Sequence, residues 1–590
     1  MEKATTCEIE QRSSLDSPEA NVVAVPGVHA KTIILVLVSV LPLLLKNTLW
    51  LRRDTDRAPV PSQSVCFIYF AQLMNLVGSG AFSRDIAAVV GGSAKSSWIG
   101  NTVPILAVVL SPPISQAADL WGRKWFLVGL TAAGCVGSII ISRATSMNMA
   151  IAGAVVAGLS YGAQPLVIAI PSEVLPRRHR PYAQASTNIA ASFGAVNGLL
   201  VGGALTRNGH PEGFRVYWYI VAGLYLASAI GCALLYNPPL RELQVALTQK
   251  EKLRNLDWTG YAFLATGLIL FCIGLIWSQN PYPWTDAHVL VTFLLGIAIS
   301  AGLIVYETRF KKDGMFHHML FNRGRNFALA LGCIFVEGVV FFTCTGYYPF
   351  QVSVLYTSDP LLSGLRFSVL FLVGCVSTII AGWYCSKKKS LRLPIVASFV
   401  CFIVFNALMA TTTPGSDTEV WGYICIFGFS LGVCLNGLVT VAQFGTPPAM
   451  IAVATGLVIG IRSLGGAIGL AIYNAIFTPT LSHGLAQKVP AAVLPLGLPP
   501  SSLGPFMAGL LANNATALSG VPGISESIIA AGGHAVLEAY SVGFRYVWIA
   551  AGCFSVVGLI GMSSFLRIHT SRVKFQRLTR LGSYRCLFHY

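Results

Sequence analysis

The run FALALGCIFVEGVVFFTCTGYYP, residues 327–349, decides the fold class of this chain. It is 23 residues long and holds a single charged side chain, Glu337. A helix needs about 20 mostly apolar residues to cross the hydrocarbon core of a bilayer. The run therefore predicts a membrane-spanning helix with one carboxyl group near its middle.

Comparable apolar runs recur along the chain and bring the expected number of spans to fourteen. Of the 590 residues, 54% are hydrophobic and only 11% are charged, whereas soluble domains carry about 25% charged residues. This composition predicts an all-α integral membrane protein. The expected spans are 66–84, 97–118, 125–143, 148–170, 184–205, 216–236, 259–277, 289–307, 327–349, 363–384, 393–411, 419–443, 452–476 and 544–566.

The first 65 residues are expected to form a cytoplasmic N-terminal tail, of which 33–65 is ambiguous. Residues 1–30 are polar and show no cleavable signal peptide. The apolar run Ile33–Leu45 is short for a span, and the pair Ser39-Val40 recurs as Ser64-Val65. Two interpretations stay open: residues 41–65 are an insertion, either real or an artefact of the gene model, or the region contains an interfacial or additional helix.

The distribution of Lys and Arg orients the spans. With the N-terminus inside, 31 basic residues fall in cytoplasmic segments and 7 in outside segments, as the positive-inside rule requires. Both chain ends are then cytoplasmic, and we expect a multi-pass protein of the plasma membrane. The net charge of +17 faces anionic inner-leaflet lipid, so nucleic acid is not an expected partner. Asn514 begins an Asn-Ala-Thr sequon in a predicted outside loop and is a candidate glycosylation site.

The spans form two halves around a connector. We expect an N-terminal six-helix bundle over 66–236, a linker with two extra helices over 237–326, and a C-terminal six-helix bundle over 327–566. The second bundle contains a long outside loop, 477–543, and a basic cytoplasmic tail follows at 567–590. The halves share a sequence feature, because a basic stretch follows the second span of each half: DLWGRKW (119–125) and GWYCSKKKSLR (382–392). Carriers built from such repeats bind substrate between the halves, near mid-membrane.

The fifth span of each half is rich in glycine. Residues four apart share a helix face, so these glycines allow a neighbouring helix to approach closely. The seam could slide during transport or could be static tight packing. The residues concerned are Gly194, Gly198, Gly202 and Gly203 in one half and Gly456, Gly460, Gly465, Gly466 and Gly469 in the other.

Several motifs resemble the major facilitator superfamily. The stretch SQAADLWGRKW (115–125) resembles the family's GxLxDxxGRK signature, although Ser115 replaces its first glycine. The fifth span resembles the antiporter motif GxxxGPxxGG, with Leu199 in place of its proline. The stretches 78–106, 256–270 and 455–472 are similar to fourteen-span drug–proton antiporters, in particular to fungal toxin efflux pumps of the trichothecene type. The resemblance covers roughly residues 66–570.

The resemblance implies a latch at the cytoplasmic end of the second span. In such carriers, the positions of Asp119, Gly122, Arg123 and Lys124 hold the two halves in one state through salt bridges. The alternative is that Arg123 and Lys124 only fix the membrane topology. We expect Glu173, which starts the next basic loop, to act as a structural hinge.

Charges inside the spans are candidates for coupling transport to protons. A carboxyl group at mid-membrane is costly and usually faces a cavity or a partner. Desolvation disfavours its charged form, so Glu337 is the leading candidate for proton coupling. Arg462 could pair with Glu337 or with an acidic substrate, or could reach toward the membrane surface. Asp85, at the outer end of the first span, could guard the outer mouth or merely cap a helix.

We expect a secondary active exporter of a small lipophilic compound, driven by protons through alternating access, with Phe341 facing the cavity. The alternatives are an importer of the same fold, for example of a siderophore, and a membrane receptor that moves nothing. The chain has no HExxH, GxSxG or Walker A motif, so we do not expect an enzyme. Its scattered cysteines have no zinc spacing. No metal or cofactor is expected, and the expected partners are the bilayer, a small-molecule substrate and protons, with the protein acting as a monomer.

Overall fold

The computed structural model describes residues 59–92, 95–174, 180–207, 212–238, 242–278, 282–311, 314–322, 325–388, 390–447, 450–511 and 518–563. Within these residues, fourteen helices are long and apolar enough to cross a membrane, and every regular element is helical. The predicted fold class and number of spans are therefore confirmed. Residues 1–58, 567–590 and Asn514 lie outside the described residues, so the predictions made for them are not addressed by the structure.

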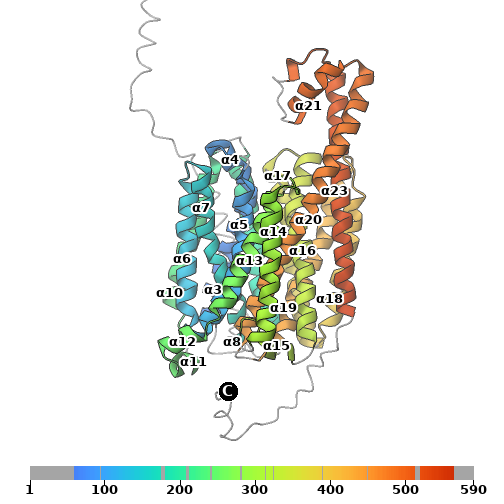
Figure 1. Ribbon diagram of the computed structural model, residues 1–590. Coiled ribbons are helices and arrows are strands. Elements are labelled where there is room, and N and C mark those ends of the chain that lie inside the picture. Colours follow the sequence, from blue (N-terminus) through green and yellow to red (C-terminus); the bar gives the residue numbers. More distant parts are fainter. Residues whose placement is uncertain are drawn as a thin grey trace, which may run out of the picture. The chain divides into compact units, whose positions relative to one another are not determined.

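The first six spans form the N-terminal bundle (Figure 1). The fourth of them is interrupted: a 3-10 segment that begins after Gly158 separates two α-helices. The short helix α4 connects the first two spans. The elements are α3 (Pro59–Ala81), α4 (Ser83–Val90), α5 (Ser97–Trp121), α6 (Arg123–Ser142), α7 (Met147–Gly158), η2 (Leu159–Ala163), α8 (Gln164–Val174), α9 (Arg180–Thr206) and α10 (Gly213–Leu235).

The first span begins earlier than the sequence analysis predicted. Helix α3 starts at Pro59, so residues 59–65, which the analysis assigned to a possible insertion, form its first turns. Ser64 and Val65 are buried there. Proline is well tolerated in the first turn of a helix because its missing N–H has no intrahelical partner there.

Two additional spans, α13 and α14, lie between the halves in sequence. Helix α13 packs mainly on α14, and its other edge packs on α5 and α20. Helix α14 is largely exposed, as expected of a helix that faces lipid. The elements of this connector are α11 (Glu242–Ala246), α12 (Gln249–Asn255), α13 (Trp258–Trp277), α14 (Ala287–Val305), η4 (Tyr306–Phe310) and α15 (His318–Asn322).

A buried acidic pair joins the start of α13 to the end of α14. It lies at the end of the spans that the positive-inside rule predicts to be cytoplasmic, which we call the inner end. Asp257 caps α13 by accepting a hydrogen bond from the backbone N–H of Gly260 at 3.1 Å, and Lys311 lies 3.5 Å from its carboxylate. Burial acts to raise the pKa of Asp257. Its hydrogen bonds with the Glu307 carboxyl and the Gly260 N–H, together with the Lys311 charge, outweigh burial and lower that pKa. Glu307 also accepts a hydrogen bond from the N–H of Met315 at 3.1 Å, so this network fastens the base of the hairpin.

The last six spans form the C-terminal bundle, which meets the N-terminal bundle along two seams. Helix α9 packs along α17, and α5 packs on α20. The core of the C-terminal bundle is rich in aromatic contacts, such as those of Phe427 with Phe402 and Phe405. Its spans are α16 (Asn326–Leu355), α17 (Pro360–Lys388), α18 (Arg392–Ala410), α19 (Asp417–Phe444), α20 (Ile451–Val493) and α23 (Glu526–Ser563).

The segment 477–543 differs from the long outside loop expected from the sequence, because most of it is helical. Helix α20 has 43 residues, a length of about 64 Å at 1.5 Å per residue, and a bilayer core is only about 30 Å thick. Its extension and that of α23 project beyond the other spans together with η6 (Leu494–Leu496), η7 (Pro500–Ser502) and α21 (Leu503–Leu511) (Figure 1). We call this part of the protein the outer lobe.

The outer lobe has an apolar core of its own, which explains why the expected loop is ordered. Leu485, Val489 and Val493 follow one another at intervals of four, so they share one face of α20. They pack with Phe506 of α21 and with apolar residues of α23. Lys488 and Glu538 of the two long helices form an ion pair at 3.0 Å. The sequence analysis expected a loop over 477–543, but the helical spacing of these apolar residues stabilises helices there.

Candidate functional site: a cavity above a buried ion pair

A cavity of about 630 Å³ lies between the two bundles. Its volume falls in the range of about 300–1,000 Å³ that is typical of small-molecule sites. It is lined by α3, α5 and α9 of one bundle and by α16, α17 and α20 of the other. Six phenylalanines contribute aromatic surface: Phe82, Phe341, Phe342, Phe350, Phe367 and Phe371.

The cavity is confined to one end of the spans. Helices α3, α9 and α16 line it with their C-terminal halves, whereas α5 and α17 do so with their N-terminal halves. Because these helices alternate in direction, all of the lining segments lie at the same end. The positive-inside rule predicts that this end, which carries few Lys and Arg residues, is the outer one.

A bidentate ion pair between Glu337 and Arg462 lies at mid-span. The Nε atom of Arg462 donates to Oε2 of Glu337 at 2.6 Å, and its Nη2 atom donates to Oε1 at 2.9 Å. The Glu337 side chain is fully buried and that of Arg462 is 11% exposed. The structure thus places Glu337 and Arg462 in direct contact, which was one of the alternatives left open by the sequence.

Phe341 separates this pair from the cavity. Its ring lines the cavity, and the guanidinium carbon of Arg462 lies 4.3 Å from the ring centroid. An arginine over an aromatic face gains about 0.5–2 kcal/mol, more when water is excluded. Phe341 therefore forms the cavity floor and touches one partner of the ion pair, so a cargo that displaces this ring would also disturb Arg462.

The N-terminal bundle contributes polar groups near the ion pair. Tyr69 of α3 interacts electrostatically with both Arg462 and Glu337, and its hydroxyl accepts a hydrogen bond from Nε2 of Gln164 at 3.3 Å. Gly338 allows the close packing that the pair needs, because a Cβ atom there would overlap the carbonyl oxygen of Arg462. Tyr69 and Gln164 had no signal in the sequence, since an isolated polar residue in a span does not reveal its neighbours.

The inner end of the N-terminal bundle holds a buried ionic cluster. Nη2 of Arg123 donates to Oδ1 of Asp119 at 2.9 Å and to Oε1 of Glu173 at 2.7 Å, and Nη1 also donates to Glu173. Glu173, which the sequence analysis treated as a hinge residue, thus completes the cluster. Lys124 lies apart from it and donates to Oδ1 of Asn237 at 2.6 Å.

Gly122 makes the turn that forms this cluster. Its φ of 96° ends α5 and begins α6, and L-residues with a side chain rarely adopt that conformation. The amide of Gln244 also fills the space that a Cβ atom would need. This turn leaves Asp119 and Arg123 one helical turn apart on either side of the bend, within reach of each other.

Polar and close backbone contacts join the two bundles near the same inner end. Nη1 of Arg180 donates to the carbonyl oxygen of Gln443 at 3.2 Å, and Nε2 of Gln184 lies 3.4 Å from Oε1 of Gln443. Ser111 and Ser115 of α5 pack against Gly456 of α20. The bundles are therefore in contact at the inner end. At the cavity end they stay in contact along α9 and α17, where Gly203 packs on the Leu361 backbone.

The glycines of the two fifth spans pack against different partners. Gly194 packs on the Phe70 backbone of α3, and Gly198 and Gly202 pack mainly on α3, Tyr217 and Phe82, all within the N-terminal bundle. Gly465, Gly466 and Gly469 pack on α16 within the C-terminal bundle. Gly203, next to Leu361, and Gly456 and Gly460, next to α5, lie between the bundles. Only this last group is placed to affect their relative movement directly.

The substitution Gly456→Val tests the contact at the inner end. A valine Cβ atom would overlap the Ser115 hydroxyl and lie 2.9 Å from the Ser111 carbonyl oxygen, so we expect the bundles to separate there and transport to fall. Hydrogen exchange followed by mass spectrometry should show faster exchange in 440–460. The matched control is Gly332→Val, where a Cβ atom meets no other atom within 4 Å. Equal exchange in both variants would contradict the assignment.

The outer mouth has its own charged residues. Asp85, in the first turn of α4, lines the cavity but lies at its outer part rather than beside Glu337. Asp359 also lines the cavity and pairs across the bundles with Arg207 at 3.1 Å. Arg366, an intramembrane charge to which the sequence analysis gave no role, pairs with Asp417 at 2.5 Å and lies over the Trp421 ring.

The fold, with two six-helix bundles that pack together and enclose a cavity toward one end of the spans, defines a membrane transporter of small molecules. The chain belongs to the Major Facilitator Superfamily, whose family model matches residues 65–470. The cavity, the ion pair at its floor and the inner contact described above are features of this transporter.

Similar proteins agree with this assignment. The chain is 26% identical to the MFS-type transporter ucsD of an Acremonium species over 66% of each chain. It is 25% identical to the MFS-type efflux transporter ffsH of Aspergillus flavipes over 80% of each chain. Among solved structures, the xylose transporter XylE from E. coli in a partially occluded inward-open conformation matches with a TM-score of 0.50 and 12% identity. That match covers 86% of this chain and 97% of XylE and concerns the fold alone.

Proposed function

We propose that the protein exports a small, uncharged, ring-containing lipophilic compound across the plasma membrane in exchange for protons. The single observation that carries this proposal is the ion pair between Glu337 and Arg462 at the cavity floor. A buried carboxylate held by a buried guanidinium forms a unit whose stability depends on whether the carboxylate carries a proton. It is thus a device that can link protonation to the arrangement of the helices that carry the two residues.

The cavity lining supports the choice of cargo. Its aromatic surface suits ring systems, which stack favourably on phenylalanine. Among its lining residues in the described part of the chain, the charged ones are Asp85 and Asp359, and both are acidic. A small acidic cargo would find no basic partner in this wall, so we favour a neutral compound over an anionic chelate. The relative ffsH of Aspergillus flavipes, which is named as an efflux transporter, supports the direction.

The transport cycle follows from alternating access between two conformations. The cavity lies at the end that the positive-inside rule predicts to be the outer one, and the bundles are in contact at the opposite end. In this conformation a proton from outside would reach Glu337 when the Phe341 ring moves, and the neutral acid would release Arg462. Losing the pair weakens the packing of α16 on α20, which favours the conformation open at the inner end. Each pH unit across the membrane supplies about 1.4 kcal/mol per proton for this cycle.

Flux in proteoliposomes with an imposed pH gradient tests the proposal. The probes are Nile red and a panel of other neutral aromatic dyes, and an entrapped pH indicator reports proton movement. We expect dye to move against the direction of proton flow. Movement of dye and protons in the same direction would instead support import. The absence of flux for every probe under any gradient would overturn the proposal in favour of a receptor.

A further inference from the structure

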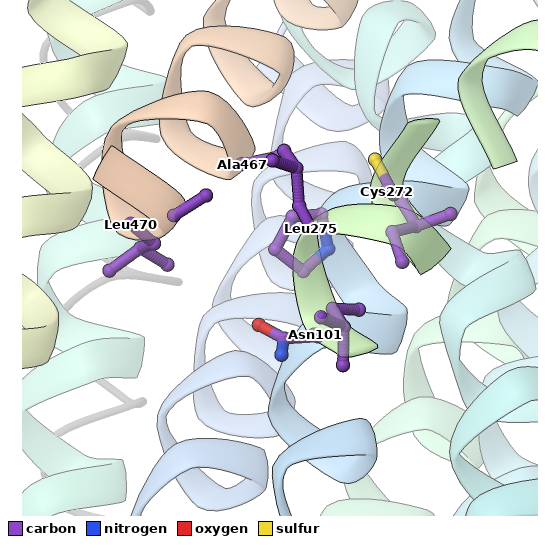
Figure 2. A pocket seen from close by; sticks show the side chains of 9 residues that line it. Asn101, Cys272, Leu275, Ala467 and Leu470 are labelled. Atoms are coloured by element: carbon purple, nitrogen blue, oxygen red, sulfur yellow. The ribbon is translucent and has the colours of Figure 1, made fainter. Parts of the chain in front are cut away.

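A second, small pocket lies where α5, α13 and α20 meet (Figure 2). Its walls include Asn101 and Pro104 of α5, Cys272 and Leu275 of α13, and Ala467 and Leu470 of α20. Its volume of about 30 Å³ is about that of one water molecule. It is therefore too small to hold a cargo, and its interest lies in what it connects.

The pocket adjoins the main cavity, and we call it the side branch. Asn101, Pro104 and Leu470 line both the pocket and the cavity. From them the pocket leads between α5 and α20 to Cys272 and Leu275, which close it on the side of α13 (Figure 2). Apart from the Asn101 amide, the side chains named here are apolar.

The two helices on either side of this branch are in close contact farther inward. There, Gly456 and Gly460 bring α20 against α5. Leu470 lies ten residues beyond Gly460, or about 15 Å along the helix, and there the seam opens into the pocket. Between the two levels, Leu268 and Cys272 of α13 pack into the seam in one apolar cluster.

Helix α13 covers the seam with one edge only. Its principal neighbour is α14, and Ile269 on its other side is 37% exposed. The ionic network of Asp257, Glu307 and Lys311 holds the inner end of this hairpin together. A displacement of α13 away from α5 and α20 would uncover the pocket on the side of the bilayer.

We propose that the seam between α5 and α20 is a lateral entrance, covered by α13, through which a neutral lipophilic molecule passes between the bilayer and the cavity. This inference rests on the proposed function in one respect, the lipophilic nature of the cargo. It adds the route that the cargo takes and assigns a functional role to the connector helices. A bilayer concentrates such molecules, so a side opening reaches a far larger pool than the aqueous mouth does.

Photolabelling of the full-length protein in lipid nanodiscs tests the route without any gradient or flux. The probe is a neutral aryl-trifluoromethyl diazirine that partitions into lipid, flashed after increasing times and mapped by mass spectrometry. In the wild-type protein we expect the label on Leu73 and Phe342, inside the cavity. With Ala467→Trp, which fills the branch, labelling there should slow about tenfold, as an added barrier of about 1.4 kcal/mol would produce.

Matched variants separate a blocked route from a damaged protein. Cys272→Phe fills the same branch from α13 and should slow cavity labelling in the same way, whereas Ile269→Trp, on the exposed side of α13, should not. A quaternary-ammonium analogue of the probe enters from water and should label the cavity equally in all variants. Unchanged labelling of the cavity by the neutral probe in both filled variants would overturn the lateral entrance, whatever the flux measurements show about export.

Discussion

Replacing Glu337 with glutamine is expected to reduce accumulation driven by a pH gradient to the level of protein-free vesicles. Glutamine keeps the shape of the side chain but cannot take up a proton at neutral pH. The exchange of labelled for unlabelled cargo without a gradient should continue, because it does not need net proton movement. Flux in proteoliposomes, measured with and without the gradient, separates these two activities.

The same substitution leaves Arg462 buried without its partner. Breaking a buried ion pair from one side costs about 3–5 kcal/mol, so lower thermal stability alone could explain lost transport. The double variant Glu337→Gln/Arg462→Gln removes both charges and should recover most of that stability without recovering coupling. Glu538→Gln, in the exposed pair of the outer lobe, is the control and should change stability by about 0–1 kcal/mol. Normal coupling in Glu337→Gln would exclude Glu337 from the proton pathway.

Replacing Arg123 with glutamine is expected to open the inner end of the protein and to lower transport strongly. The Arg123 side chain is 4% exposed and contacts both Asp119 and Glu173, so its loss removes the guanidinium charge from beside two carboxylates. We expect a cost of about 3 kcal/mol, at the lower end for a buried ion pair because Glu173 keeps some exposure. A change of that size shifts an equilibrium between two conformations by more than about 100-fold.

Accessibility of an introduced thiol measures this opening. Ser115 is fully buried at the contact with Gly456, so Ser115→Cys should react slowly with a water-soluble maleimide in an otherwise unchanged protein. Adding Arg123→Gln should make it react quickly. Lys124→Gln is the matched control, because its ammonium group binds Asn237 outside the cluster. Similar reactivity in both variants would mean that Arg123 sets the topology and does not act as a latch.

The charged residues of the site show which contacts can be predicted from nearby sequence and which cannot. Asp119 and Arg123 are four residues apart, so the motif that contains them already suggested an interaction. Glu173 follows Arg123 by 50 residues, and its place in the cluster depends on how α8 packs beside α5 and α6. Glu337 and Arg462 were both recognised as unusual because they interrupt apolar spans, but their separation by 125 residues left the pairing open.

The outer lobe is a region where the expectation from the sequence was wrong, because a loop was expected and the chain forms helices. Pro479 and Pro490 lie within the continuous helix α20, although proline usually ends or bends a helix. The apolar residues spaced along Leu485, Val489 and Val493 could have indicated the helix, because they repeat with helical spacing. The search for membrane-spanning runs did not predict the extension of this helix, because the extension is stabilised by an apolar core outside the expected bilayer.

The sequence by itself determined the number of spans and their helical nature, because in lipid each backbone polar group must bond within its own segment. That constraint is local, so the length and apolarity of one run decide whether it can span. Tertiary structure alone decided which charges meet, which end the cavity occupies and which seam α13 covers. Those features depend on close packing between segments far apart in the chain, and such packing is set by the shapes of many side chains at once.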